Sequence, residues 1–162
     1  MANIYEPEFD GDRDDPTGFK ARRAYLGRQA GAERIGASLW ELQPGDAPYP
    51  YHFHLGSEEF LIVLKGRPHL RTQSGWRQME EGECAAFPVG EGGAHQVHNR
   101  TDETVRMLSI SEMNAPEVVV QPDSGKVGAR ERAAGPDASG LWHTSFLADG
   151  VKHFEGESVP EV

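Results

Sequence analysis

Histidine and acidic side chains gather in two short segments of the chain, at spacings suited to metal binding. His52 and His54 are separated by one residue, and the acidic pair Glu58-Glu59 follows after a short turn. Residues two apart on a β-strand point to the same face, so both imidazoles would project to one side. His95 opens a later strand, just after a glycine-rich loop. Three imidazoles and a carboxylate suit zinc, iron, manganese, nickel or copper.

Either member of the acidic pair could supply that carboxylate. Both precede the apolar run Phe60–Leu64, and a carboxylate at the start of a buried strand is costly unless it is paired or ligated. Neighbouring residues on a strand face opposite ways, so only one of the two can join the histidines easily. Strand geometry therefore leaves Glu58 and Glu59 as alternatives.

These residues resemble two sequence motifs of the cupin superfamily. The first motif is glycine, five residues, His-x-His, three or four residues, glutamate, six residues and glycine. The chain matches it, with one additional residue after the first glycine, at Gly45, His52, His54, Glu59 and Gly66. The six-residue interval before Gly66 favours Glu59 over Glu58.

The second motif is glycine, five residues, Pro-x-Gly, two residues, histidine, three residues and asparagine. The chain matches it at Gly82, Pro88, Gly90, His95 and Asn99. The interval between Gly90 and His95 is two residues longer than the motif, an insertion of the kind that loops tolerate. The resemblance covers residues 35–112. The segment from Pro116 to Gly128 also resembles small bacterial single-domain cupins of unassigned activity.

The resemblance implies an all-β, jelly-roll-type barrel that holds one divalent transition metal ion, with a small molecule in the barrel. By the same analogy the ligands are His52, His54, Glu59 and His95, and the protein is a homodimer. Four protein ligands on a six-coordinate metal leave two positions open, which suits an oxygenase, an isomerase or a lyase. The alternative is a binding or sensor protein without catalytic activity, because this fold hosts both.

Short strands separated by turns must position these residues. Most segments are rich in β-branched and aromatic residues, and between residues 20 and 121 none keeps a helical period over three turns. We expect strands at residues 23–29, 34–42, 51–54, 58–64, 69–73, 77–80, 83–87, 95–99, 105–111 and 117–121. Ten strands at this spacing predict an all-β sandwich or barrel.

Three regions follow from this pattern. Residues 1–20 form an acidic N-terminal arm, residues 21–121 form the barrel, and residues 122–162 form an irregular extension. The extension contains a tryptophan and two phenylalanines, so we expect it to pack on the barrel or on a partner subunit.

Other polar residues have weaker signals. Tyr49, Tyr51, Arg71 and His69 could reach the barrel mouth and line a pocket, although ordinary packing or solvent exposure explains them equally well. Cys84 lies among small apolar residues, which favours burial over nucleophilic chemistry. Asn99 is expected to be structural.

Composition excludes several classes of function. The 162-residue chain has 16 basic and 26 acidic residues, a formal net charge of −10, which disfavours binding to nucleic acid. No stretch is long and apolar enough for a membrane span, and the N-terminus lacks the pattern of a secretory signal. With one cysteine, no intramolecular disulfide can form, which suits a reducing compartment, so we expect a cytoplasmic protein.

Overall fold

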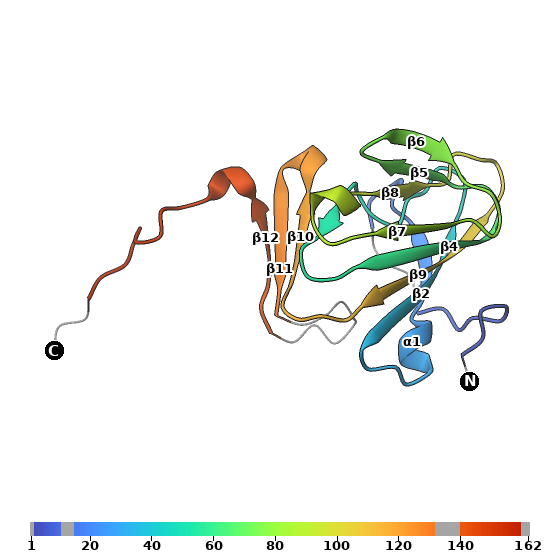
Figure 1. Cartoon of the computed structure of the whole chain (residues 1–162), viewed down its shortest axis with the longest axis horizontal. Helices are drawn as coiled ribbons and strands as arrows, with labels where there is room; N and C mark the ends of the chain where they lie inside the picture. Colours follow the sequence, from blue (N-terminus) through green and yellow to red (C-terminus); the bar gives the residue numbers. More distant parts are fainter. Residues whose placement is uncertain (1, 11–14, 132–139, 160–162) are drawn as a thin grey trace.

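Antiparallel strands make up nearly all of the regular structure (Figure 1). The computed structural model describes residues 2–10, 15–131 and 140–159. Its largest sheet has the order β1-β2-β9-β4-β7. These strands span Ala21–Ala24, Ile35–Leu42, Val105–Glu112, Glu59–Lys65 and Cys84–Phe87, respectively. The predicted all-β class is confirmed.

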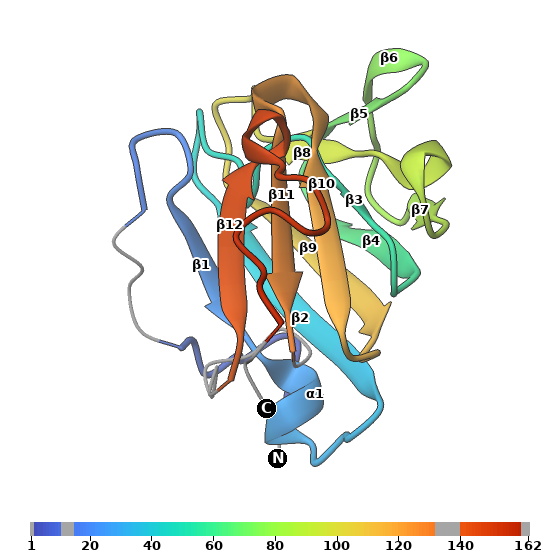
Figure 2. The same ribbon diagram turned by 90° about the vertical axis from the view of Figure 1, so that its left-hand side faces the viewer.

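Two smaller sheets complete the strand layers. One has the order β12-β11-β10-β3, with strands at Trp142–Phe146, Lys126–Arg130, Glu117–Gln121 and Phe53–His54. The other has the order β6-β5-β8, with strands at Gly75–Gln78, His69–Thr72 and Gln96–His98. A single antiparallel bridge between His52 and His95 links the segments leading into β3 and β8, and so joins the two sheets. Figure 2 shows β10, β11 and β12 in front of the large sheet.

The main apolar core lies on one face of the large sheet. This core forms because every second residue of a strand points to the same face of the sheet. On β2, Trp40 and Leu42 join this core, whereas Leu39 faces the opposite side. The other core residues include Leu61, Val63, Leu70, Met79, Val97, Val105 and Met107.

The opposite face of the large sheet is covered by the start of the chain and by the short helix α1, Leu26–Gln29. Leu26 packs with Leu39 and Leu108, and Ile4 and Phe9 of the N-terminal segment join them. A strand over residues 23–29 was therefore the wrong prediction: the strand ends at Ala24 and a helical turn follows. A turn that buries Leu26 leaves no periodic signal in the sequence, because it is too short.

The remaining expected strands are present, with ends that differ by one or two residues. Short 3-10 turns lie at Glu91–Gly93, Pro122–Ser124 and Leu147–Asp149. The C-terminal extension contributes β11 and β12, which continue the sheet of β10. Cys84 is exposed, contrary to the expectation of burial, because β7 turns Phe87 and not Cys84 into the core. In the described ranges, no helix has the length and apolarity needed to cross a membrane.

Candidate metal centre

His52 and His95 lie directly opposite each other. Each backbone N–H donates to the other's carbonyl, at 3.0 Å and 2.9 Å. Residues opposite each other in an antiparallel pair project to the same face, so the two rings are neighbours, with centroids 4.6 Å apart. The chain thus brings together two histidines that are far apart in sequence through a backbone pairing.

Both rings are oriented by a local carbonyl. Nδ1 of His52 lies 2.8 Å from the carbonyl oxygen of Pro50, and Nδ1 of His95 lies 2.9 Å from that of Gly93. A carbonyl oxygen can only accept, so Nδ1 of each ring carries the proton and donates it. In the neutral form of either ring the lone pair is therefore on Nε2, the arrangement that a metal-ligating histidine requires.

The loop before His95 depends on glycine. A Cβ at Gly93 would lie 1.9 Å from the carbonyl oxygen of Pro88, and Gly90 has φ 91°, a conformation that other residues rarely adopt. The two residues by which this interval exceeds the cupin motif are accommodated in the 3-10 turn Glu91–Gly93. The insertion consequently leaves His95 beside His52.

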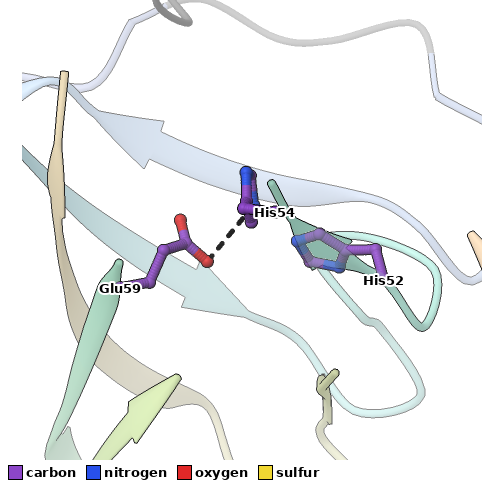
Figure 3. A group of neighbouring side chains, drawn as sticks. All are labelled: His52, His54 and Glu59. Atoms are coloured by element: carbon purple, nitrogen blue, oxygen red, sulfur yellow. Dashed lines mark ion pairs between the residues drawn. The ribbon is translucent and has the colours of Figure 1, made fainter. Parts of the chain in front are cut away.

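His54 and Glu59 complete the group (Figure 3). One oxygen of Glu59, Oε2, lies 3.5 Å from Nε2 of His54 and 3.2 Å from Nε2 of His95. Donor atoms of His52, His54 and Glu59 all lie within 4.8 Å of one another. The structure therefore brings three of the expected ligands into one group and places the fourth, His95, against two of them, Glu59 and His52.

Burial and mutual contacts shift the pKa values of these side chains. Burial and the neighbouring His95 lower the pKa of His52 to about 3, so this ring stays neutral near pH 7. Burial opposes ionisation of Glu59, but its contacts with His95 and His54 outweigh this and lower its pKa to about 2. A neutral imidazole and an ionised carboxylate are the forms that bind metal.

The donor set fits a transition metal ion. Both ring nitrogens of His54 are buried, and each has an ion-pair contact of 3.5 Å to a carboxylate but, among the described residues, makes no hydrogen bond. These polar atoms are therefore poorly satisfied, which is costly. Metal–ligand bonds of about 2.1 Å would place neighbouring donors roughly 3.0–3.4 Å apart. The 3.2 Å and 3.5 Å contacts of Glu59 come close to that spacing without any rearrangement.

Glu117 is a further acidic residue of the site, and it was not predicted. It is 4% exposed, and its Oε1 accepts hydrogen bonds from the backbone N–H of Gly56 at 3.1 Å and of Val118 at 2.9 Å. Its other oxygen, Oε2, lies 3.5 Å from Nδ1 of His54. The pairing of Val119 with His54 explains this, because Glu117, two residues earlier on β10, faces the same side.

Glu117 and Glu59 act on His54 from two sides. Burial disfavours the charged ring, but the contact with Glu117 and the charge of Glu59 together raise the pKa of His54. Burial likewise opposes the charge on Glu117, and its contacts with His54 and Ser57 lower its pKa overall. A carboxylate behind a metal-ligating imidazole holds the ring in position and increases its basicity.

The structure separates the two members of the acidic pair. Glu59 points to the histidines, whereas Glu58 is exposed and its backbone N–H donates to the carboxylate of Glu112 at 3.1 Å. Asn99 is fully buried and structural: its amide donates to the carbonyls of Leu42 and Glu103, at 3.1 Å and 2.7 Å.

The four side chains line a cavity of about 430 Å³. Tyr51, Arg71 and His69, expected as pocket residues, are not among the described residues of its wall. On β5 the buried Leu70 faces inward, so His69 and Arg71 face outward. Arg71 forms an ion pair with Asp123 and stacks on Tyr51, 4.0 Å from the ring centre. The cavity wall does include Tyr49, the other residue expected near the barrel mouth. It also includes polar residues that were not predicted: Arg23, Arg28, Gln96, Gln121 and Arg130.

A known domain can be recognised within the chain. Residues 38–111 match the Cupin_2 family model, described as a cupin domain, and the same segment contains the four candidate ligands. This segment is a cupin domain. Its strands form the all-β cupin fold, a jelly-roll-type barrel.

Two solved structures are similar over most of the chain. A sugar phosphate isomerase of the cupin superfamily from Silicibacter pomeroyi has a TM-score of 0.77 and 25% identity, over 92% of this chain and 94% of that one. A protein from Acidithiobacillus ferrooxidans, provisionally named a sugar phosphate isomerase, has a TM-score of 0.74 and 27% identity, over 83% and 81%.

A more distant structure shares the fold alone. The polyketide cyclase RemF from Streptomyces resistomycificus has a TM-score of 0.57 and 23% identity, over 69% of this chain and 78% of that one. Among curated proteins, none matches this chain.

Proposed function

We propose that this cupin binds one divalent transition metal ion through His52, His54, Glu59 and His95 and uses it to isomerise a small carbonyl compound. The observation that carries the proposal is the convergence of two buried imidazoles, a third that is half-buried, and one ionised carboxylate on the wall of a cavity of about 430 Å³. Cavities of roughly 300–1,000 Å³ accommodate small organic ligands.

The chemistry of the site supports an isomerase. A bound metal ion would supply Lewis acidity, which polarises a carbonyl oxygen without a redox change. Isomerisation moves a hydrogen from a hydroxyl-bearing carbon to the adjacent carbonyl carbon and the hydroxyl proton to the former carbonyl oxygen, so it needs no oxidant or second substrate. Two of the similar structures are named as sugar phosphate isomerases, which supports this branch over an oxygenase.

The side chains of the chain itself would bind and orient the substrate. His52 and His95 are fixed by carbonyl oxygens, and Glu117 holds His54, so the ligand set is ordered before metal or substrate arrives. Such preorganisation reduces the cost of positioning reacting groups. The apolar residues Leu61, Phe87 and Met107 line the same cavity and would exclude water from the substrate.

The test combines metal analysis with an assay for isomerisation. Protein purified without chelators should contain about one equivalent of transition metal, and should interconvert aldose and ketose phosphates when followed by NMR. Removing the metal should abolish the conversion, and restoring it should recover the conversion. A well-folded protein that takes up no metal, even after reconstitution, would contradict the proposal.

Two other functions give different results in the same experiment. An oxygenase would consume dioxygen in a substrate-dependent way with iron or manganese bound. A binding or sensor protein would hold its metal, with no conversion of any compound in a metabolite panel. Either outcome would reject the isomerase while keeping the metal centre.

We also propose that two copies of the chain associate through β12. This strand is at the edge of its sheet, and Trp142 and Phe146 on it are 58% and 51% exposed. Open strand edges with apolar side chains favour pairing with another chain.

Light scattering after gel filtration tests the dimer. The wild type should have the mass of a dimer, and the double variant Trp142→Glu/Phe146→Glu should have the mass of a monomer. A wild-type monomer at micromolar concentration would contradict the proposal.

A further inference from the structure

The cavity that contains the candidate metal ligands has a positively charged wall. Arg23 of β1, Arg28 of α1 and Arg130 of β11 all line it, whereas Glu59 is the one carboxylate among its described lining residues. This concentration of arginine stands out in a chain whose formal net charge is −10. Because a local cluster can outweigh the global charge, the cavity attracts anions although the protein surface is acidic.

Arg130 projects from the same face as the residues that hold His54. It lies directly opposite Glu117 in the pairing of β10 with β11, and opposite residues of an antiparallel pair share a face. Glu117 contacts His54, and Arg130 is close enough for its charge to act on the same ring. The guanidinium is therefore near the metal ligands.

The guanidinium of Arg130 has N–H groups available to donate hydrogen bonds to a ligand. Its central carbon, Cζ, lies over the ring of Trp142, 4.8 Å from the ring centre. In the described part of the chain, no carboxylate forms an ion pair with this guanidinium. Stacking fixes the plane of a guanidinium and leaves its N–H groups free to donate in that plane. This geometry suits an oxyanion with two or more acceptor oxygens.

Arg23 is ordered in a similar way on the large sheet. Its guanidinium lies 3.9 Å from the ring centre of Tyr25 and 4.9 Å from that of Trp40, and Nη1 donates to the hydroxyl of Tyr49 at 2.9 Å. The ring of Tyr49 lies 5.8 Å from that of His52. Arg23 is thus connected through Tyr49 to the histidine side of the cavity.

We propose that Arg130 and Arg23 form an oxyanion subsite that binds the phosphate group of a small phosphorylated substrate. The other end of that substrate would lie at His52, His54, Glu59 and His95. This inference rests on the proposed isomerase activity, because that activity defines the carbonyl end of the substrate. The binding of phosphate itself does not depend on the metal, so the two proposals can be tested separately.

The test measures ligand binding by calorimetry on metal-free and metal-loaded protein. The probes are inorganic phosphate, fructose 6-phosphate and fructose, of which the last two differ only in the phosphate group. Fructose 6-phosphate should bind at least about tenfold more tightly than fructose, because charge-assisted guanidinium–phosphate contacts are among the stronger hydrogen bonds. Inorganic phosphate should bind the metal-free protein and compete with fructose 6-phosphate.

Variants assign the phosphate to the arginines. Arg130→Gln should weaken binding of inorganic phosphate about tenfold or more, and Arg130→Lys should restore only part of it, because lysine keeps the charge but loses the planar donor set. Arg67→Gln is the matched control, since Arg67 is exposed and outside the cavity wall. Arg23→Gln tests the second arginine independently, and it too should weaken the binding of inorganic phosphate. Circular dichroism checks that each variant is folded.

Equal affinity for fructose and fructose 6-phosphate would overturn the subsite, and so would unchanged phosphate binding in Arg130→Gln. Metal content is measured on the same samples. Protein that binds metal but not phosphate rejects the subsite alone, whereas protein that binds phosphate but not metal rejects the metal centre alone.

Discussion

His52 and His95 are paired backbone to backbone, and each ring donates from Nδ1 to the carbonyl oxygen two residues earlier in the chain. The same local contact therefore sets the tautomer of both rings, and both present Nε2 as the lone-pair nitrogen. This repetition connects strand pairing to metal chemistry, since the backbone bridge fixes where the rings lie and the carbonyls fix which nitrogen is available.

Removing either ring should remove the metal. His52→Ala and His95→Ala each delete one nitrogen donor from the proposed set of four, so metal content measured by plasma mass spectrometry should fall from about one equivalent to near zero. His98→Ala is the matched control, because His98 is on β8 but contacts the carbonyl of Gly45 instead of the cluster. Full metal content in His52→Ala would reject this ligand assignment.

The adjacent glutamates provide a second matched pair of variants. Glu59→Gln removes the charge 3.2 Å from His95 and should weaken metal binding by about tenfold or more. Glu58→Gln should leave the affinity unchanged, because Glu58 is exposed and points away. Competition with a chromogenic chelator measures both, and equal losses in the two variants would contradict the assignment.

Glu117 should influence the metal without binding it. Glu117→Gln keeps the shape of the side chain but removes the negative charge behind His54, so affinity should fall about 10–100-fold while the stoichiometry stays at about one. Glu112→Gln is a suitable control, since this exposed carboxylate contacts Asn114 and the backbone of Glu58. Loss of the metal with altered stoichiometry would instead make Glu117 a ligand.

The sequence was sufficient for the class of fold and for the four clustered residues, because both depend on period-2 alternation and on motif spacing. Glu117 could have been found by the reasoning that identified Glu59, since it too is an acidic residue at the start of an apolar strand. It was missed because no motif contains it, and because the pairing of β10 with β3 is a long-range contact.

The cavity wall could not be predicted in the same way. Arg23, Arg28 and Arg130 come from β1, α1 and β11, and nothing local in the sequence indicates that these elements surround one space. Arg71 could not be placed from the sequence either, because it was not known which residues of β5 face inward. A shift of one residue exchanges the inward and outward faces of a strand. Tertiary packing decides which face is buried.

The pKa shifts predict that the metal-free protein loses stability in mild acid. The pKa of His52 falls from 6.5 to about 3 on folding, so between these values the unfolded chain binds a proton that the folded chain does not. Glu59, lowered from 4.5 to about 2, acts in the same direction at lower pH. The free energy of unfolding should therefore decrease as the pH falls from 6.5 towards 3, by up to about 1.4 kcal/mol per pH unit for each proton.

His54 acts in the opposite direction and in another range. Its raised pKa means that its contribution is complete below pH 6.5 and is lost as the pH rises through its folded value. Urea unfolding of chelator-treated protein between pH 6.5 and 5 follows His52, because His54 acts above this range and Glu59 acts below it. The wild type should lose stability across this range, and His52→Gln should lose distinctly less. His98→Gln should follow the wild type, and identical pH slopes for His52→Gln and the wild type would show that His52 is not held neutral by the fold.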